Sequence, residues 1–318
     1  MLSRYASLAS RRAFSTAATK QTKVAFIGLG AMGRFMSKNL LSAGFAVKGY
    51  DINPATEQFC KEAGMTYCGS LAETVKDVDF VVTCLPATAH VEEVLKSDGG
   101  IFKSANEGTV ICDVSTIKPS ASAKFYEEAK KYNMTFLDTP MSGGVTGAER
   151  GTLTFMIGGT DQEFELSKNV LKGMGKNFFH CGKPGMGEVA KLTNNLILGI
   201  SMVASCEGMA IGEKLGIDPK KLMQILSVST GRNWCIDTYN PRPGNMENVP
   251  ASRQYDNGFA VSLVKKDMIL AMECAHEADA KTDMLEKSLA YYVDLERKGK
   301  GTKDFGIAYQ YIMKNYDL

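Results

Sequence analysis

A lysine and two asparagines open a long apolar segment in which a charged side chain is out of place. Residues 185 to 195 read GMGEVAKLTNN, and the run after them, LILGISMVASCEGMAIGEKLG, has small and apolar residues on every face of a helix. Such a helix is expected to pack against protein all round. On it Lys191, Asn194 and Asn195 stand at i, i+3 and i+4 and so share one face. That face presents one proton carrier and two amides, a set suited to moving a proton at a bound substrate.

A glycine-rich loop is the second group of residues that could take part in chemistry. In DTPMSGGVTGAERGT, residues 138 to 152, further glycines and hydroxyl residues surround Ser142, Gly143 and Gly144. Successive backbone N–H groups in a concave turn of this kind form a nest that binds an anion. A flexible glycine loop is the alternative for this composition alone. The presence of the lysine face elsewhere in the chain favours the anion site.

A glycine pattern near the start of the folded chain is the third group. Gly28, Gly30 and Gly33 follow the apolar run at 23–27 in GxGxxG spacing and precede a helical pattern that ends near Leu41. The first glycine permits a tight turn, the second lets the backbone approach a pyrophosphate, and the third lets helix and strand pack closely. The pattern predicts a dinucleotide site.

Asp51 strengthens the dinucleotide prediction, because it follows a second strand that ends at Tyr50. A carboxylate there accepts hydrogen bonds from the adenosine ribose and repels a 2′-phosphate, so NAD is expected in preference to NADP. The predicted cofactor site also includes the neighbouring residues Leu29, Ala31, Met32 and Asn53.

Strands and helices alternate around these residues and predict an α/β fold with a doubly wound Rossmann-type sheet. Apolar runs at 80–85, 109–114 and 135–137 are expected as strands, with Pro86 and Thr116 just after strand ends. Ligands bind at those carboxyl ends, so the loops LPATAH and DVSTIKP are candidates to cover the nicotinamide, although either could be an ordinary connector. A hairpin-like segment, GTLTFMIGG, is expected to finish this domain near Cys181.

Beyond Gly182 the pattern is helical, with periodic segments at 219–229, 260–280 and 282–298. The predicted organisation is a leader at 1–21, a Rossmann domain at 22–183 and an all-α domain at 184–318 joined to it by a long helix. The active site is expected between the two domains.

Charge and composition exclude several classes of partner. With 37 basic and 35 acidic residues, no nucleic-acid surface is expected. The uncharged run at 192–206 is too short to span a bilayer, so no membrane is expected either. No acidic residue precedes Asp51, and the opening MLSRYASLASRRAFSTAATKQ places arginines beside an apolar face. This predicts a mitochondrial transit peptide and a matrix location, with a disordered basic terminus as the alternative.

Cysteines and histidines provide little material for a metal site. The eight cysteines form no CxxC pair and no zinc spacing, and no metal is expected. His90, His180 and His276 are far apart in the sequence, so each is expected to be a satisfied core or surface histidine and not a member of a triad.

Four motifs resemble those of the β-hydroxyacid dehydrogenase family and occur in that family's order over nearly the whole chain after the leader. They are GLGAMG after the first strand, DxPxSGG, GxxxKxxNN at the start of a long helix, and FAVSLVKKDMILA near residue 260. The stretch TGRNWCIDTYNPRPGNMENVPASRQYDNGF is similar to one typical of members that act on 3-hydroxyisobutyrate. The resemblance implies NAD-dependent oxidation of that acid, in valine catabolism, by a homodimer or homotetramer built through the helical domain.

The resemblance also implies roles for individual residues. Lys191 would be the catalytic acid/base, Asn195 would orient the substrate, and Ser142 with the amides of Gly143 and Gly144 would hold the substrate carboxylate. Asp267 and Lys266 would lie over the active-site mouth and the cofactor, Trp234 and Phe259 would shape the pocket, and Leu85, Pro86 and Thr116 would touch NAD. The roles of His90, where relatives tend to carry asparagine, and of Arg232 stay open.

Three other functions compete with this one. A sister enzyme acting on glyoxylate, succinic semialdehyde or tartronate semialdehyde is disfavoured by Asp51 and by the PRPGNMENVP segment. A 6-phosphogluconate dehydrogenase would carry histidine in place of Asn194 and a larger helical domain. A catalytically silent dinucleotide-binding scaffold is disfavoured by the presence of Lys191. The alternatives for Lys191 itself are a side chain that reaches solvent or one that pairs with Glu188.

Overall fold

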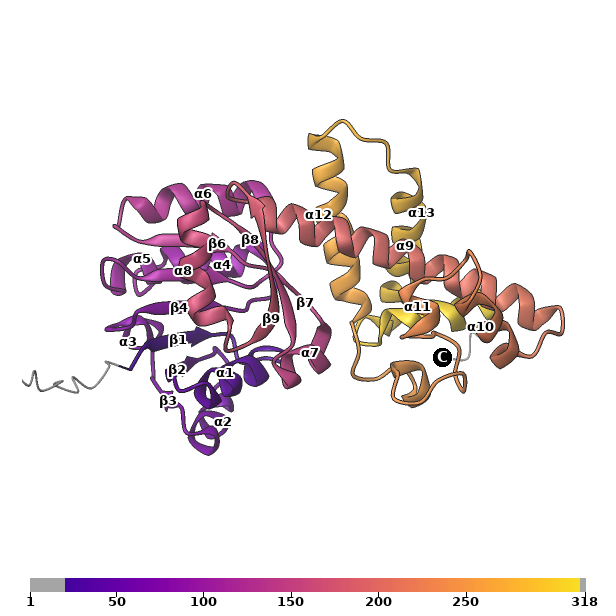
Figure 1. Cartoon of the computed structure of the whole chain (residues 1–318), viewed down its shortest axis with the longest axis horizontal. Coiled ribbons are helices and arrows are strands. Elements are labelled where there is room, and N and C mark those ends of the chain that lie inside the picture. The colour runs from indigo at the N-terminus through magenta and orange to yellow at the C-terminus, as the bar shows by residue number, and fades with distance from the viewer. Residues whose placement is uncertain (1–20, 315–318) are drawn as a thin grey trace, which may run out of the picture.

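The N-terminal half folds as a parallel sheet because its short apolar strands each alternate with a helix. The computed structural model describes residues 21–314, and Figure 1 shows the sheet-containing half joined to a helical half. The strands lie in the order β3-β2-β1-β4-β5-β6, all parallel. They are β1 (Lys23–Ile27), β2 (Ala46–Tyr50), β3 (Thr66–Tyr67), β4 (Phe80–Thr83), β5 (Val110–Asp113) and β6 (Thr135–Asp138). The predicted doubly wound fold is confirmed.

Helices cover both faces of this sheet and bury its alternating side chains in two cores. Along β1, Val24 and Phe26 point into one core while Ala25 and Ile27 point into the other, as the two-residue period of a strand requires. The helices are α1 (Gly33–Ser42), α2 (Thr56–Ala63), α3 (Leu71–Val75), α4 (Thr88–Lys96), α5 (Ile101–Ser104) and α6 (Pro119–Lys130). The strand order reverses between β1 and β4, which creates the crevice where ligands of such sheets bind.

A second, three-stranded sheet follows, and it corrects the prediction of a hairpin at GTLTFMIGG. That segment forms the single strand β8, which pairs antiparallel with β7 and parallel with β9. A parallel pair needs a crossover and cannot be closed by a tight turn, and here α8 provides it. The elements are β7 (Met141–Ser142), α7 (Gly144–Arg150), β8 (Leu153–Gly158), α8 (Asp161–Leu171) and β9 (Gly175–Gly182).

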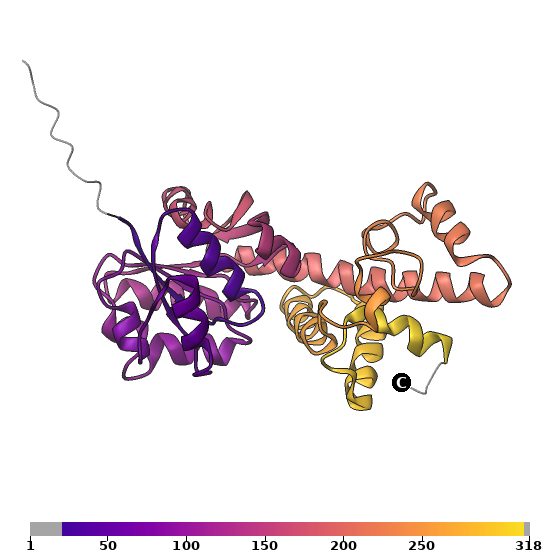
Figure 2. The same ribbon diagram turned by 90° about the horizontal axis from the view of Figure 1, so that it is seen from below.

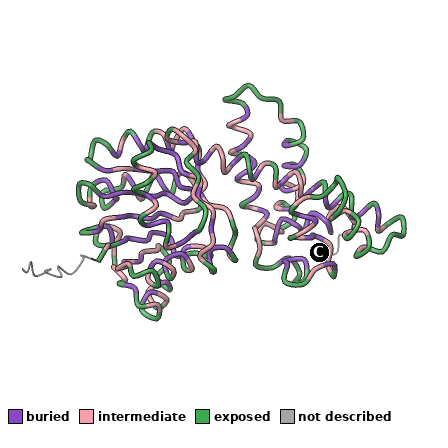
Figure 3. The backbone as a smooth tube through the Cα atoms, viewed as in Figure 1, coloured by how far each residue is buried: buried purple, intermediate pink, exposed green. Residues whose placement is uncertain are grey.

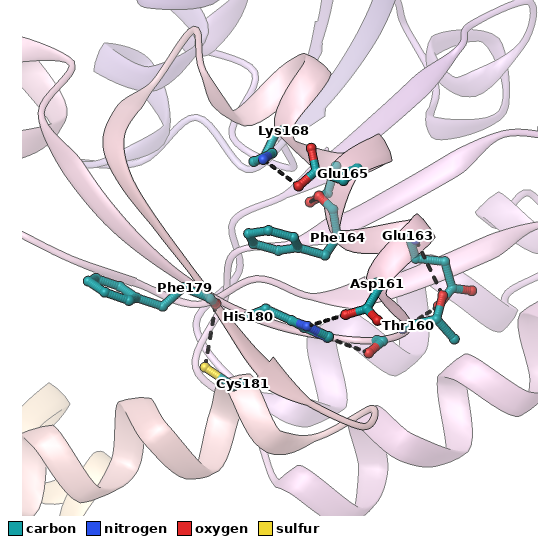
Figure 4. A network of polar contacts seen from close by, with 11 residues as sticks. Thr160, Asp161, Glu163, Phe164, Glu165, Lys168, Phe179, His180 and Cys181 are labelled. Atoms are coloured by element: carbon teal, nitrogen blue, oxygen red, sulfur yellow. Dashed lines mark hydrogen bonds and ion pairs between the residues drawn. The ribbon is translucent and has the colours of Figure 1, made fainter.

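His180 on β9 confirms the expectation of a satisfied histidine. Its Nε2 lies 2.7 Å from the carbonyl oxygen of Gly159, and its Nδ1 lies 3.0 Å from the carboxylate of Asp161. Figure 4 shows the ring beside Phe164 at the start of α8, where the two rings stack. The histidine therefore ties β9 to α8 and has a structural place in the fold.

The C-terminal half is helical, and none of the strands described in residues 21–314 begins after Gly182. Its own core has fully buried side chains such as Met209, Met268 and Tyr292. The helices are α9 (Met186–Lys214), α10 (Pro219–Ser227), α11 (Trp234–Asp237), α12 (Val261–Glu277), α13 (Asp283–Leu295) and α14 (Ala308–Met313), with short 3-10 or π turns at Pro250–Arg253, Glu296–Lys300 and Phe305–Ile307.

Helix α9 leaves the small sheet and runs the length of the helical half (Figures 1 and 2). Its length and an apolar window with a mean hydropathy of 1.4 would by composition allow a membrane crossing, and 44% of that window is buried inside the protein. The prediction that α9 packs all round is wrong for a single chain. Ile197, Ile211 and Leu215 are 58%, 61% and 82% exposed. The predicted leader lies almost wholly outside the described residues.

Candidate functional site

The glycine loop after β1 has the shape that a dinucleotide requires. A Cβ atom at Gly28 would lie 2.2 Å from the carbonyl oxygen of Cys84, and one at Gly33 would lie 1.9 Å from the carbonyl oxygen of Gly28. Both glycines are therefore required by close backbone packing. Gly30 is exposed, and a Cβ there would meet nothing within 4 Å, so this glycine borders open space. Packing at the first and third glycines and space at the second fit a bound pyrophosphate.

The start of the helix that follows the loop is suited to an anion by its dipole. The N–H groups of Arg34 and Phe35 bond the carbonyl oxygens of Gly30 and Met32, while Met32 at the N-cap of α1 makes no side-chain hydrogen bond to the helix and the first turn holds no acidic residue. The positive end of the helix dipole favours a negative charge there. Ala31 is exposed and Met32 half-buried, whereas the side chain of Leu29 is fully buried in the core, so only its backbone can face a ligand.

Asp51 lies beside the loop and holds it in place. Its carboxylate accepts hydrogen bonds from the N–H of Leu29 at 2.7 Å and of Asn53 at 2.8 Å. A carboxylate has about four acceptor positions, so acceptor capacity remains for a ribose hydroxyl. The residues present therefore fit the adenosine ribose of a dinucleotide.

The loops after β4 and β5 are contacted by the helical half. Lys266 on α12 donates from Nζ to the carbonyl oxygens of Pro86 at 3.1 Å and Thr116 at 2.8 Å. The N–H of Leu85 donates to the hydroxyl of Ser115 at 2.9 Å, which fixes the two loops to each other. The predicted cofactor residues Leu85, Pro86 and Thr116 therefore lie together at the carboxyl ends of the strands. Lys266, predicted for the same site, reaches them from the helical half of the chain.

The beginning of α9 is pinned to the sheets by a buried aspartate. Asp138, at the end of β6, accepts hydrogen bonds from the N–H of Gly185 at 2.8 Å and of Glu188 at 3.1 Å. A Cβ at Gly187 would lie 2.4 Å from the carbonyl oxygen of Met156 on β8. The first turn of α9 therefore sits directly against β6 and β8.

Lys191 lies one turn further along α9 and makes no hydrogen bond or ion pair with any residue in 21–314. Its side chain is only partly accessible. Burial lowers the pKa of Lys191, against the opposing effects of Asp267 and Glu188, while Lys266 lowers it further. A lysine with a lowered pKa can hold or release a proton near neutral pH.

Asn195 connects the lysine face to α12. It is 2% exposed, and its Nδ2 donates to Asp267 at 2.6 Å, while Asp267 lies 3.3 Å from the ammonium of Lys266. Asn194 is exposed and donates to the Oδ1 of Asn195 at 3.0 Å, so it supports Asn195 from outside and does not share the buried face as predicted. The polar path runs from α9 through α12 to the cofactor loops.

The Ser142 loop is linked to the start of α9 through β8, and it is more ordered than a free nest. Ser142 pairs with Thr154 on β8, two residues from Met156, which touches Gly187 at the start of α9. Gly143 and Gly144 have φ values of 135° and 61°, and Gly144 begins α7. A strand end and a helix start are found here in place of the flexible loop that was the alternative to the predicted nest, and the first N–H groups of α7 have no acceptor within that helix.

Trp234 and Phe259 lie apart from the lysine. Trp234 is 48% exposed and stacks on Tyr239 at 4.7 Å, and its neighbour Asn233 bonds Ser205 on α9. Ser205 follows Lys191 by fourteen residues, about 21 Å along the helix. The N–H of Phe259 donates to Asp304 at 2.8 Å, and its ring packs on Phe305. In one chain these aromatic residues form a cluster around Asp304 and not a wall beside Lys191.

His90 and Arg232, whose roles the sequence did not decide, are at the surface. His90 is exposed on α4, and Arg232 forms an exposed ion pair with Asp237 at 2.5 Å. No group of three or more His, Cys, Asp or Glu side chains within 21–314 could hold a metal ion.

Sequence reasoning missed a cluster of three buried carboxyl groups, within electrostatic reach of one another, at the start of α9. Asp113, Asp138 and Glu188 are 0%, 1% and 0% exposed. Burial raises the pKa of Asp113 to about 6 and raises that of Glu188 well above its ordinary value. Only the position of Glu188, three residues before Lys191, could have signalled the cluster, because the two aspartates end different strands.

Comparison with known protein families matches both halves of the chain. Residues 23–182 match the NAD-binding domain of 6-phosphogluconate dehydrogenase, and residues 185–312 match a domain described as NAD-binding of NADP-dependent 3-hydroxyisobutyrate dehydrogenase. The division between these two matches falls in the turn between β9 and α9.

Individual proteins match over nearly the whole chain. A probable mitochondrial 3-hydroxyisobutyrate dehydrogenase of Dictyostelium discoideum is 44% identical over 96% of this chain and 94% of its own. An NAD-dependent L-serine dehydrogenase of Pseudomonas aeruginosa is 39% identical over 90% of this chain and 96% of its own. The solved structure of a Mycobacterium tuberculosis 3-hydroxyisobutyrate dehydrogenase with L-serine covers 92% of this chain and 99% of its own, at 32% identity and a TM-score of 0.86.

Proposed function

Because the chain belongs to the 3-hydroxyisobutyrate dehydrogenase family of NAD(P)-dependent oxidoreductases, we propose that it oxidises 3-hydroxyisobutyrate to methylmalonate semialdehyde with NAD. The observation that carries this proposal is the position of Lys191. The lysine has no hydrogen-bond or ion-pair partner within residues 21–314 and has a lowered pKa, and the pair Asn195–Asp267 beside it leads to Lys266 and the cofactor loops.

The proposed chemistry divides one proton and one hydride between two acceptors. A bound NAD supplies the acceptor for the hydride that leaves the alcohol carbon. Neutral Lys191 takes the hydroxyl proton as general base, and protonated Lys191 returns it in the reverse reaction. Oxidation should therefore rise with pH until Lys191 is neutral, and reduction of the aldehyde should fall over the same range.

The carboxylate of the acid would be held by the Ser142 loop. The hydroxyl of Ser142 and the first N–H groups of α7, at Gly143 and Gly144, are donors that match a carboxylate. The pairing of Ser142 with β8, which also touches the start of α9, supports placing the carboxylate beside Lys191. Asn195 would orient the hydroxyl end.

L-serine is a second candidate substrate. It shares the hydroxymethyl group and the carboxylate of 3-hydroxyisobutyrate and carries an ammonium where that acid carries a methyl group. The relative named as an L-serine dehydrogenase and the solved relative with L-serine favour testing it. NAD is proposed over NADP on Asp51, whose negative charge would repel a 2′-phosphate, although the family model for residues 185–312 is named for an NADP-dependent enzyme.

We also propose that the protein is a homodimer or a tetramer of such dimers. The exposed stripe of α9 consists of Ile197, Ala204, Gly208, Ile211 and Leu215, spaced as on one helix face. Figure 3 shows exposed residues at the outer ends of α9 and α10. In an antiparallel pair of these helices, Ala204 of one copy would face Gly208 of the other and Ile197 would face Leu215. The stripe is therefore self-complementary, as a two-fold interface must be.

The proposed compartment is the mitochondrial matrix, and the proposed pathway is valine catabolism. The Dictyostelium relative is named as mitochondrial, and residues 1–21 have the composition of a transit peptide. We place the two domains at 22–183 and 184–318.

Initial rates of NADH formation test the proposal directly. The panel is (S)-3-hydroxyisobutyrate, L-serine, D-glycerate and 4-hydroxybutyrate, each with NAD and with NADP. A clear preference for 3-hydroxyisobutyrate with NAD is expected. A preference for L-serine would change the proposed substrate but not the proposed type of reaction. If no acid is turned over, the alternative of a catalytically silent dinucleotide-binding scaffold would be favoured.

A further inference from the structure

Glu188 has a carboxyl group in an environment that is unusual for an ionisable side chain. It is 0% exposed, and neither of its carboxyl oxygens has a hydrogen-bond partner within residues 21–314. Its backbone N–H is bound by Asp138, so the side chain is held in place by the first turn of α9. A buried polar group without partners costs about 1–3 kcal/mol, and a catalytic role is one of the reasons why proteins keep such groups.

Charged groups face Glu188 from every element around it. Asp113 at the end of β5 and Asp138 at the end of β6 disfavour its anion, and Lys266 on α12 favours it. The N–H of Ile117 also favours the anion without reaching hydrogen-bonding geometry. The thiol of Cys274 on α12 lies within electrostatic reach. On α9 itself Lys191 follows at i+3, a spacing that places two side chains on the same face.

The shifts of these two groups have opposite directions. Burial raises the pKa of Glu188, and burial lowers the pKa of Lys191. The two titrations are thereby moved toward each other. An ionised Glu188 raises the pKa of Lys191, so the protonation of each side chain depends on that of the other.

We propose that Glu188 is a positioning residue that acts through Lys191, the two forming an electrostatically coupled acid–base pair, one helical turn apart and without a direct ion pair, in which the charge on Glu188 influences how readily Lys191 takes the substrate proton. This inference rests on the proposed function. In alcohol oxidation the substrate O–H bond breaks and an N–H bond forms at Nζ of Lys191, and the proton then leaves from Lys191, whose side chain is partly accessible, to solvent. Glu188 exchanges protons only and carries no electrons.

The pair predicts a distinct titration of Lys191. Since a proton bound to one group weakens the binding of a proton to the other, Lys191 in the wild type titrates over a broad pH range. In Glu188→Gln the side chain has nearly the same shape and cannot ionise. Lys191 should then titrate over a narrower range and at lower pH, because Asp267 still raises its pKa but the contribution of the Glu188 anion is gone.

The first experiment observes Lys191 itself by NMR of the full-length protein labelled with 13C at the lysine ε-carbon. The Lys191 signal is assigned by its loss in Lys191→Met. We expect a midpoint about one pH unit lower and a steeper curve in Glu188→Gln. Glu188→Asp, which keeps the charge, should restore part of the shift. The same Lys191 curve in wild type and Glu188→Gln would overturn the proposal.

A matched control lies on the same helix. Glu207 on α9 is exposed, accepts a hydrogen bond from Tyr291 and lies far from Lys191. Glu207→Gln should leave the Lys191 curve unchanged, and an equal shift in that variant would assign the effect to net charge and overturn the pair. Thermal unfolding of each variant checks that it is folded.

Kinetics separate this inference from the proposed function. The rising limb of kcat/KM for alcohol oxidation should move to lower pH by the same amount in Glu188→Gln. A shifted NMR curve with no turnover of any acid would support the pair and contradict the proposed reaction. Turnover with a limb that does not move would support the reaction and contradict the pair.

Discussion

The two ends of helix α9 depart from ordinary burial in opposite ways. At its start, Glu188 is buried without a partner and Lys191 is largely enclosed, where charged groups are normally exposed. At its far end, Ile211 and Leu215 are 61% and 82% exposed, where large apolar groups are normally buried. The proposed proton transfer by Lys191 would account for the first departure. The proposed two-fold interface would account for the second, and the two proposals together assign a separate function to each end of α9.

Loss of the amine should produce the largest effect. Lys191→Met is expected to lower kcat/KM for alcohol oxidation on the order of 10³-fold, because a positioned general base contributes roughly that much. The melting temperature should not fall, because burial disfavours the ammonium of Lys191 by more than Asp267 and Glu188 favour it, and an apolar chain of similar length replaces it. Lys214→Met, an exposed lysine at the other end of α9, is the control and should keep full activity. If the Lys191→Met enzyme is active, Lys191 is not the general base, and the proposed reason for burying charged groups at the start of α9 is contradicted.

A charge in the exposed stripe should have the next largest effect. Ile211→Asp is expected to weaken self-association on the order of 100-fold, because an isologous interface contains the substitution twice. Sedimentation velocity over a dilution series measures this. Leu166→Asp, at an exposed leucine on α8 of the other domain, should leave association unchanged. If the wild-type protein sediments as a monomer at all concentrations, the proposed dimer interface on the exposed stripe of α9 is contradicted.

Overpacking the start of α9 should destabilise the fold. Gly187→Ala would place a Cβ 2.4 Å from the carbonyl oxygen of Met156 and 2.8 Å from Oδ2 of Asp138. Backbone cannot yield easily, so a loss of about 2 kcal/mol in the free energy of unfolding is expected from chemical denaturation. Activity should fall too, because the first turn positions Lys191. A variant as stable as wild type would show that the pinning of α9 is loose.

The smallest effect is expected at Gly208, where a Cβ would meet nothing within 4 Å in the single chain. Gly208→Ala should raise the unfolding free energy of dilute monomer by up to about 1 kcal/mol through helix propensity. In the proposed dimer the same methyl group would meet the facing helix and weaken association. Stabilisation with unchanged association would argue that α9 does not pair at Gly208.

Local sequence patterns were sufficient for the parts of the fold and site that depend on neighbouring residues. The GxGxxG spacing and Asp51 predicted the first strand, turn and helix. The pattern is local, because Gly28 and Gly33 are required by close backbone packing within the same βαβ unit. The i, i+4 relation of Lys191 and Asn195 predicted their common face, because helix geometry fixes it. Strand ends at residues 83, 113 and 138 lay within two residues of the prediction.

Only the tertiary structure decided which distant groups meet. Whether β8 closes a hairpin or joins a parallel pair depends on what packs beside it, which strand periodicity does not encode. The contacts of Lys266 with Pro86 and Thr116 span more than 140 residues. The placement of Trp234 away from Lys191 and the enclosure of Glu188 by two strand ends also depend on packing between elements. Burial, and with it the protonation of Glu188 and Lys191, is set by these long-range contacts, because desolvation depends on everything that surrounds a group and not on its neighbours in the chain.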